Sequence, residues 1–568
     1  MNEYPNSAYE SASQDTETIP FITESPTLMT EEEKEKRIRH FGLFGLSSVI
    51  YALFYTFCLY KNASGITYPF FTGGTLFYFF SSLKKLGISA KKDSAFYAVS
   101  IELLGISTFC TDNKNIISMN KWGIFILFFI LFIHNFYQDK LWDIFKYLQA
   151  ILQTMLGSLQ ALTRPVTDFK LYRKAEKIKE KDKMSSAAYI FIGILISLPL
   201  LIVVLSLLSS ADIVFRSFIR DYIFIDWLSE NFIGLSFSFL FSFFASYCIL
   251  AYLEKRSIKE EITNKRIGEP LIAVTFTAIL SLIYLLFSGI QIIYLFAGNM
   301  QLPEQYTYAE YAREGFFQLL FVCLINLVLV LVCLSRFKES KALKAILTII
   351  SLCTYIMIAS SAMRMLLYIQ YYDLTFLRFF VLWSLIVIFF LMTGILIHIY
   401  KEAFPLFKYC ITVVTILYIA FSFSRPDYFI ARYNITQMLE KEGTESGRPD
   451  YDTEYLLSLS ADAAPAILNT KTLPALLDGP ESSVRWIHDL ESWKNDDMRN
   501  WHPNTYRPTT WMEKYLHYTH YDSILLVEHE GSKWRTFNLS RYTMKKCMNP
   551  FTMSLFTKNK CPVFYLLY

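Results

Sequence analysis

The chain has 568 residues, of which 53% are hydrophobic and only 18% are charged. Soluble domains carry about a quarter charged residues, so this composition argues against a water-soluble protein and indicates that lipid is the solvent. The formal net charge of +4 is too small to indicate a nucleic-acid partner.

The first 40 residues are predicted to form a cytoplasmic arm with a basic flank. Residues 1–30 are rich in Ser, Thr, Glu and Pro and contain no Lys or Arg. They predict a disordered acidic arm, because such a segment buries too little apolar surface to fold. Four basic residues at 34–39 then precede an apolar run that starts at Phe41. That run is expected to act as an uncleaved membrane anchor.

A transmembrane domain is predicted for residues 41–424. About 20 apolar residues are needed to cross the hydrocarbon core, and most of the apolar runs in this region have that length. The run at 95–111 is shorter and contains Glu102. The expected fold class is an all-α polytopic membrane helix bundle with about 11 transmembrane helices. The predicted spans are 41–60, 64–83, 95–111, 119–137, 186–209, 232–253, 271–296, 316–335, 343–368, 374–399 and 406–424.

The distribution of positive charge predicts how these spans are oriented. With eleven spans, one set of loops contains about 29 Lys and Arg residues and the opposite set about six, and Lys and Arg are retained on the cytoplasmic side. The N-terminus is therefore expected inside the cell and the C-terminus outside. Omitting the run at 95–111 would exchange the sides of all later loops and reverse the asymmetry, so eleven spans are preferred over ten.

Residues 141–163 are predicted to form an amphipathic cytoplasmic helix, because apolar residues recur there at steps of three and four. Two positions for this helix are open. Either it lies in the membrane interface, where Lys140, Lys146 and Arg164 would meet anionic lipid headgroups, or it packs on the helix bundle. The basic stretch at 170–183 is interpreted as a solvated flank of the next span.

Residues 425–568 are predicted to form a small extracytoplasmic tail with mixed α and β structure. A helix at 428–442 and a second helix after a Gly, Ser and Pro break would form an αα-hairpin. Further on, 524–527 and 534–537 flank a turn with Gly and predict a β-hairpin. Very few residues separate the last span from the first of these helices, so the tail is expected to dock on the outer loops. Arg432 would then lie near acidic groups at the outer helix ends.

The sequence contains no motif for nucleotide binding, zinc-dependent proteolysis or serine hydrolysis. No catalytic residue, cofactor or metal site is therefore predicted. His, Asp and Glu residues at 488–502 lack a metal-ligand spacing and are interpreted as part of a solvated loop. For Cys547 and Cys561 in the tail, a disulfide and two free thiols are both open alternatives.

A cluster of polar residues is predicted at the outer face of the spans. Ionisable groups are costly within lipid, so they mark either a pathway or a partner. The favoured interpretation is that these groups pair with each other and fix the order of the helices, for example Glu314 with Arg364. The alternative is an outward-open cavity roofed by the tail. The candidate residues are Asp212, Arg216, Arg313, Glu314, Gln318, Arg364, Tyr368, Asp373, Arg378 and Arg432.

Five segments, taken in order, are similar to those of a known family. They are 210–215 (SADIVF), 313–320 (REGFFQLL), 364–378 with its RMLLYI and LTFLR phrases, 425–434 with RPD and IARYN, and 455–465 (YLLSLSADAAP). Together they resemble domain of unknown function 4173, a family of bacterial multi-spanning membrane proteins. The resemblance implies a bacterial cytoplasmic membrane protein with a folded segment after the last span. It implies no activity, substrate or catalytic residue.

Three classes of function are compatible with the sequence. Transport of a small solute or ion is favoured by the many spans and the polar groups at the outer face. A sensor, scaffold or envelope-assembly factor that uses the external tail is the first alternative. An enzyme acting on lipid or envelope precursors is the least supported, since no acid–base pair with suitable spacing occurs. The bilayer is the one partner that the composition itself indicates.

Overall fold

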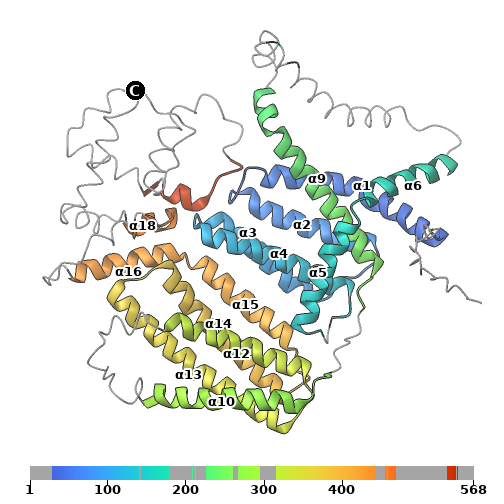
Figure 1. The fold of residues 1–568 in the computed structure, drawn as a ribbon. Coiled ribbons are helices and arrows are strands. Elements are labelled where there is room, and N and C mark those ends of the chain that lie inside the picture. Colours follow the sequence, from blue (N-terminus) through green and yellow to red (C-terminus); the bar gives the residue numbers. More distant parts are fainter. Residues whose placement is uncertain are drawn as a thin grey trace, which may run out of the picture.

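The computed structural model describes residues 29–139, 142–179, 208, 212, 225–259, 266–293, 315–441, 455–456, 458–467, 534–544 and 546–547. Figure 1 shows that long helices packed side by side make up most of this part of the chain. Apart from one isolated β-bridge, between Gly268 and Phe337, the described residues form helices, turns and connections.

Eight of the described helices are long and apolar enough to cross a membrane. Their number identifies the chain as a multi-pass integral membrane protein with a helical bundle. They are α1 (Glu31–Leu59), α4 (Lys114–Phe136), α9 (Ile225–Lys255), α10 (Pro270–Gln291), α12 (Phe316–Arg336), α13 (Lys341–Tyr372), α14 (Phe376–Tyr400) and α15 (Leu406–Phe423).

Two further helices, α2 (Thr67–Lys85) and α3 (Ser94–Cys110), pack between α1 and α4. Helix α3 corresponds to the weak run at 95–111. At its start, the Ser94 hydroxyl donates to Asn135 Oδ1 near the end of α4, at 3.0 Å. At its other end, the Thr111 hydroxyl donates to Asp462 of the tail. Helix α3 therefore extends from one end of the bundle to the other. The predicted span 186–209 lies outside the described residues, so the total of eleven stays a prediction.

The helix bundle has two ends, the tail face and the N-terminal face. The tail face holds the α1–α2, α3–α4 and α13–α14 connections and the tail. The N-terminal face holds the start of α1 and the α2–α3, α12–α13 and α14–α15 connections. Helix α1 begins at Glu31, ahead of the predicted start at Phe41, because Thr30 caps it and Glu32 pairs with Lys36 one turn later, at 2.7 Å.

The helices form two hydrophobic cores. One core lies among α1–α4, α9 and α15, and the other among α10, α12, α13, α14 and the tail. An aromatic seam joins the two cores, because Phe376, Phe379 and Trp383 of α14 pack against Phe421 of α15 with ring centroids 5.0–6.3 Å apart.

Two helices at the N-terminal face run across the bundle and not along it (Figure 1). They are α5 (Ile144–Gln160) and α6 (Arg164–Lys179). Helix α5 packs on α9, and α6 packs on α1. Residues 170–179 of the stretch interpreted as a solvated flank belong to α6, and Lys170 and Lys174 there are exposed. The buried carboxylate of Asp168, earlier in the same helix, pairs with Arg37 of α1 at 2.5 Å and fixes α6 on the bundle.

The described part of the tail is helical and docks on the tail face. It contains α16 (Pro426–Lys441), a 3₁₀ turn (Ala461–Ala463) and α18 (Ala464–Ile467), which pack together. The prediction of a strand at 534–537 is wrong, since these residues form a turn. Its first strand partner, 524–527, lies outside the described residues. The mixed α/β character expected of the tail is therefore not seen in the described residues.

Hydrogen bonds to the spans hold the turn at 534–537 in place. The Arg535 guanidinium donates to the carbonyls of Phe57 and Tyr60 at the end of α1, both at 2.9 Å. In return, the Arg535 carbonyl accepts from the Asn62 side-chain amide at 3.2 Å. The next contact is made by Asn538, whose amide donates to the Thr111 carbonyl at 2.9 Å. The tail is thus bonded to two separate connections of the spans.

Candidate functional site

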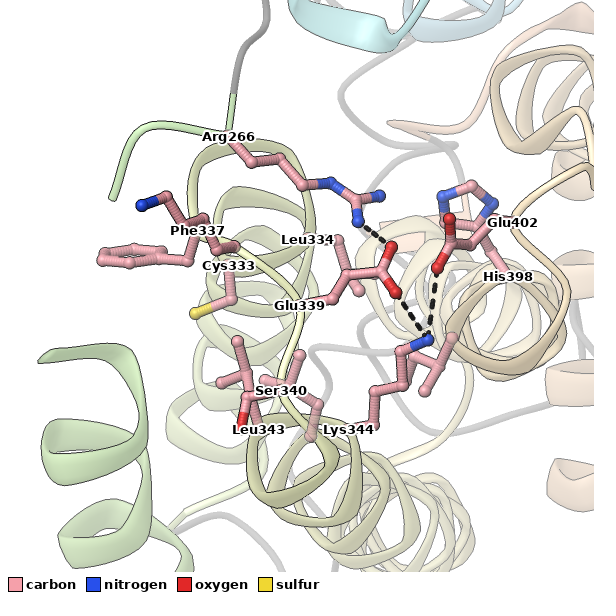
Figure 2. Close-up of a pocket in the computed structure, with 13 residues that line it drawn as sticks. Arg266, Cys333, Leu334, Phe337, Glu339, Ser340, Leu343, Lys344, His398 and Glu402 are labelled. Atoms are coloured by element: carbon pink, nitrogen blue, oxygen red, sulfur yellow. Dashed lines mark hydrogen bonds and ion pairs between the residues drawn. The ribbon is translucent and has the colours of Figure 1, made fainter. Parts of the chain in front are cut away.

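A pocket of opposite charges lies at the N-terminal face, where α12, α13 and α14 meet (Figure 2). Glu339 is in the short connection between α12 and α13, and it contacts two cations. Arg266, which precedes α10, pairs with one oxygen of Glu339, and Lys344 of α13 pairs with the other at 2.9 Å. Lys344 also reaches Glu402, just beyond the end of α14, at 3.2 Å. Four charged side chains from four segments therefore form one network.

The main chain holds Arg266 in place. The Gly268 N–H donates to the Arg336 carbonyl and the Lys338 N–H donates to the Gly268 carbonyl, both at 3.0 Å. A Cβ atom at Gly268 would stand 2.6 Å from the Phe337 ring and 3.0 Å from the Arg336 carbonyl. This close approach requires glycine. The segment before α10 is thereby clamped to the α12–α13 connection.

The network joins two cations to two carboxyl groups, and the pairs are open to water. A hydrogen bond with the neighbouring Glu402 carboxyl, followed by the contacts with Lys344 and Arg266, lowers the pKa of Glu339, so Glu339 is ionised at neutral pH. The side chains of these four residues are 31–50% exposed. Pairs as exposed as these contribute about 0–1 kcal/mol each. A charged solute could therefore replace one partner at low cost.

A cavity of about 270 Å³ adjoins the charged pocket. The two share Arg266, His398 and Glu402. The His398 Nδ1–H donates to the Phe404 carbonyl at 3.1 Å, which leaves Nε2 as its second ring nitrogen for other contacts. Apolar side chains in and beside the α4–α5 and α14–α15 connections form much of the remaining wall, together with Asp143; the apolar ones include Trp142, Ile144, Phe145, Ala403, Pro405 and Phe407. The cavity is thus charged where it meets the pocket and mostly apolar elsewhere.

Close to the charged pocket, the buried carboxylate of Asp139 joins several segments of the same face. Asp139, after α4, contacts His134 at 2.5 Å and Lys91 at 3.2 Å, and it accepts the hydroxyl of Tyr147 at the start of α5. Burial alone would raise the pKa of Asp139, but the His134 and Tyr147 hydrogen bonds and the Lys91 charge outweigh it and lower the pKa to about 2. Asp139 therefore ties α5 to the end of α4 as an ionised group.

Buried polar side chains continue from this face through the interface of α10, α12 and α13. Asn326 of α12 is fully buried, and its Nδ2 donates to Thr354 Oγ1 of α13 at 2.9 Å. Its Oδ1 has no hydrogen-bond partner among the described residues, and the same is true of the Ser288 hydroxyl of α10. The other buried polar residues of this interface are Thr277, Ser281, Gln291, Ser351, Ser360 and Ser361.

The polar interface ends at Arg364, near the tail face. Gln291 Oε1 accepts from the Ser360 hydroxyl at 2.6 Å and from the Arg364 guanidinium at 3.4 Å. One turn later, the Tyr368 ring lies 4.2 Å from the guanidinium carbon of Arg378. Arg378 also donates to the carbonyls of Tyr372 and Asp373. The structure thus groups four of the residues predicted for the outer cluster: Arg364, Tyr368, Asp373 and Arg378.

The remaining predicted members are elsewhere or outside the described residues. Gln318 and Arg432 are exposed, and no ion pair joins Arg432 to Asp373 in the described part of the chain. Asp212 is exposed, and its N–H donates to the Leu208 carbonyl at 3.0 Å. Arg216, Arg313 and Glu314 lie outside the described residues, so the predicted pairing of Glu314 with Arg364 stays a prediction.

Sequence reasoning missed the charged pocket entirely. Its members come from segments far apart in the chain, and each one alone is typical of a cytoplasmic flank rich in Lys and Glu. Gln291 was also missed, because one amide in an apolar run gives a weak signal. A polar residue at every third or fourth position of 277–291 was the pattern that could have revealed the polar face of α10.

A comparison with protein families finds one match. The model of a domain of unknown function, DUF4153, matches residues 98–470, which is more than half of the chain. The chain belongs to this family. The resemblance to domain of unknown function 4173 is therefore wrong, and the bacterial origin that it implied loses its support. No curated protein and no solved structure matches the chain. The matched region extends from α3 to the α18 helix of the tail, so it contains both the charged pocket and the polar interface.

Proposed function

We propose that the chain moves a small solute or an ion across the bilayer, through the interface of α10, α12 and α13. The observation that carries this proposal is the series of buried polar side chains on α10, α12 and α13, between the charged pocket at one face and Arg364 near the other. Polar groups within lipid are costly, and a line of them favours a pathway.

Packing is the competing explanation, since small polar residues also let membrane helices approach closely. Two observations favour a pathway over packing alone. The Asn326 and Ser288 oxygens are buried without a partner among the described residues, which suits a site that water or a solute enters. In addition, charged groups stand at both ends of the line, where a solute would enter or leave.

The test uses the full chain reconstituted in liposomes. Swelling is recorded by light scattering in isosmotic potassium chloride with valinomycin, potassium phosphate, or glycine. The wild type should swell in at least one of these solutions, and Asn326→Leu should slow that swelling by about tenfold or more, because an apolar side chain would block a polar constriction. Gln318→Leu, on the exposed side of the same helix, is the matched control and should keep the wild-type rate.

Two outcomes would count against transport by this route. One is a wild-type protein that permeabilises liposomes to none of the three solutions. The other is an Asn326→Leu variant that transports as fast as Gln318→Leu.

We also propose that the N-terminal face lies in the cytoplasm and the tail face outside. The support is the excess of Lys and Arg in the connections of the N-terminal face. Reporter fusions after Lys92 and Lys338 should then read cytoplasmic, and a fusion in the tail should read external. A cytoplasmic signal from the tail would contradict this orientation.

A further inference from the structure

Helix α5 exposes its apolar side chains. Leucines and a methionine recur along one side of the helix at steps of three and four, and each is 38–63% exposed although α5 packs on the bundle. In a water-soluble protein such a face would turn toward the core. The exposed apolar residues are Leu148, Leu152, Met155, Leu156 and Leu159.

The other two sides of α5 have different surroundings. Tyr147, Ala150, Thr154 and Gly157 are buried against the bundle. At Gly157 the approach to α9 is so close that a Cβ atom would overlap the Tyr252 ring. Between the buried side and the leucine side lies a polar edge, which includes the exposed Gln149 and Gln160. Protein, apolar and polar sides on one helix are expected of a helix that lies in the plane of a membrane interface.

Helix α6 adds positive charge directly after α5. Its sequence contains six Lys and Arg residues and two acidic residues. One of the acids, Asp168, is used inside the protein, where it binds Arg37 at 2.5 Å and Tyr247 at 2.8 Å. Lys170 and Lys174 are exposed. The outer surface of α6 is therefore basic, and it complements anionic lipid headgroups.

We propose that α5 and α6 together bind the anionic lipid leaflet at the N-terminal face, with the leucine side of α5 among the acyl chains and the basic side of α6 at the headgroups. The exposed lysines of α6 favour this occupant over a protein partner, because they complement anionic headgroups directly beside the leucine side of α5. The inference does not rest on transport. The proposed lipid-binding helix also borders the cavity beside the charged pocket, because the residues at the start of α5 line the wall of that cavity.

The first test places a fluorophore on each side of α5. Cys110, Cys547 and Cys561 are replaced by Ser, which leaves the six buried cysteines in the full chain. An environment-sensitive dye is then attached at Leu148→Cys, on the leucine side, or, as a matched control at the same level of the helix but about 100° around it, at Gln149→Cys. In vesicles of phosphatidylcholine and phosphatidylglycerol, the dye at position 148 should emit at shorter wavelength and be quenched by doxyl-labelled lipid. The dye at position 149 should be quenched by iodide.

The second test measures the preference for anionic lipid. Energy transfer from a dye at Gln160→Cys to fluorescent phosphatidylglycerol should exceed transfer to fluorescent phosphatidylcholine at the same mole fraction. The double variant Lys170→Gln, Lys174→Gln should remove the difference, and so should high salt.

Each result decides for or against the proposal. Equal quenching at positions 148 and 149 would show that the leucine side is not in lipid. A blue-shifted dye at position 148 that doxyl lipids fail to quench would show that protein, not lipid, covers this side. Equal transfer to the two lipids would refute the role of α6. Elution of each variant as the wild-type species excludes misfolding as the cause.

Discussion

Replacing Asp168 should release α6 from the bundle. The Asp168 side chain is 1% exposed and that of its partner Arg37 is 15% exposed, so the change Asp168→Leu leaves a cation without its carboxylate in a largely buried place. Breaking a buried pair in this way costs about 3–5 kcal/mol. Arg37 also donates to Thr167, which compensates in part, whereas the buried Tyr247 hydroxyl loses Asp168 as its acceptor. We therefore expect a loss of about 4 kcal/mol in the free energy of unfolding, in the middle of that range.

The loss can be measured by titrating the protein in dodecyl maltoside with sodium dodecyl sulfate and following intrinsic fluorescence. Cys248 provides a local readout, since its thiol is buried and contacts the Ala161 carbonyl at 3.3 Å, where α5 gives way to α6. In Asp168→Leu, a maleimide should label Cys248 before the bundle unfolds. The double variant Arg37→Met, Asp168→Leu should recover much of the stability, because it removes both charges together.

Glu32→Leu is the control for this experiment. It breaks the exposed pair with Lys36, whose side chains are 70–78% exposed, and should leave stability unchanged. The reasoning fails if Asp168→Leu is as harmless as Glu32→Leu, or if the double variant is as unstable as the sum of its two single changes.

Three further predictions concern the tail face. Burial raises the pKa of Asp462 in the folded protein. The stability that Asp462 contributes is therefore fully present below its pKa in the unfolded chain, about 4, and is lost as the pH rises through its raised pKa in the folded protein. Thermal unfolding between pH 4 and 8 should show this loss, and Asp462→Asn should abolish it. Gly65→Ala should lower the melting temperature by several degrees, because the added Cβ atom would stand 2.7 Å from Thr536 Cα. Gly289→Ala is the control and should leave the melting temperature unchanged, because no neighbouring atom of the described residues lies within 4 Å of a Cβ atom at that position. Arg364→Leu should reduce the yield of folded protein severalfold, and Arg336→Leu should not, since Arg364 donates to the buried Gln291 side chain, which would then keep only the Ser360 hydroxyl as a donor among the described residues, whereas the Arg336 side chain is exposed.

The spans were predictable because each one carries its own signal. A run of apolar residues long enough to cross a bilayer is a local property, and the described helices follow the predicted runs closely. The weak third run also forms a helix, α3, but this helix is shorter than the eight candidate spans, so its crossing stays a prediction from the loop charges. The periodicity of 141–163 likewise indicated a helix where α5 lies.

Features that depend on distant partners were not predictable. Helix α6 is rich in Lys and has the composition of a solvated flank, and the contact that fixes it joins residues 131 positions apart. The charged pocket has the same origin, because Arg266 meets Glu339 only after α10 and α12 have packed. The prediction of a strand at 534–537 was wrong for the opposite reason. The pattern around Trp534 suits a strand locally, but contacts with the spans hold this segment as a turn: the Arg535 guanidinium donates to two carbonyls of α1, and the Arg535 carbonyl accepts from Asn62.

The bond between Arg535 and the end of α1 has a consequence for biosynthesis. The carbonyls of Phe57 and Tyr60 are among the first to emerge at the tail face, yet the guanidinium that binds them is made 475–478 residues later. During synthesis, water must occupy these acceptors until the tail has reached the same side of the bilayer. A nascent chain released before Arg535 would keep this end of α1 open. The finished protein closes it, and a membrane protease could distinguish the two by that difference alone.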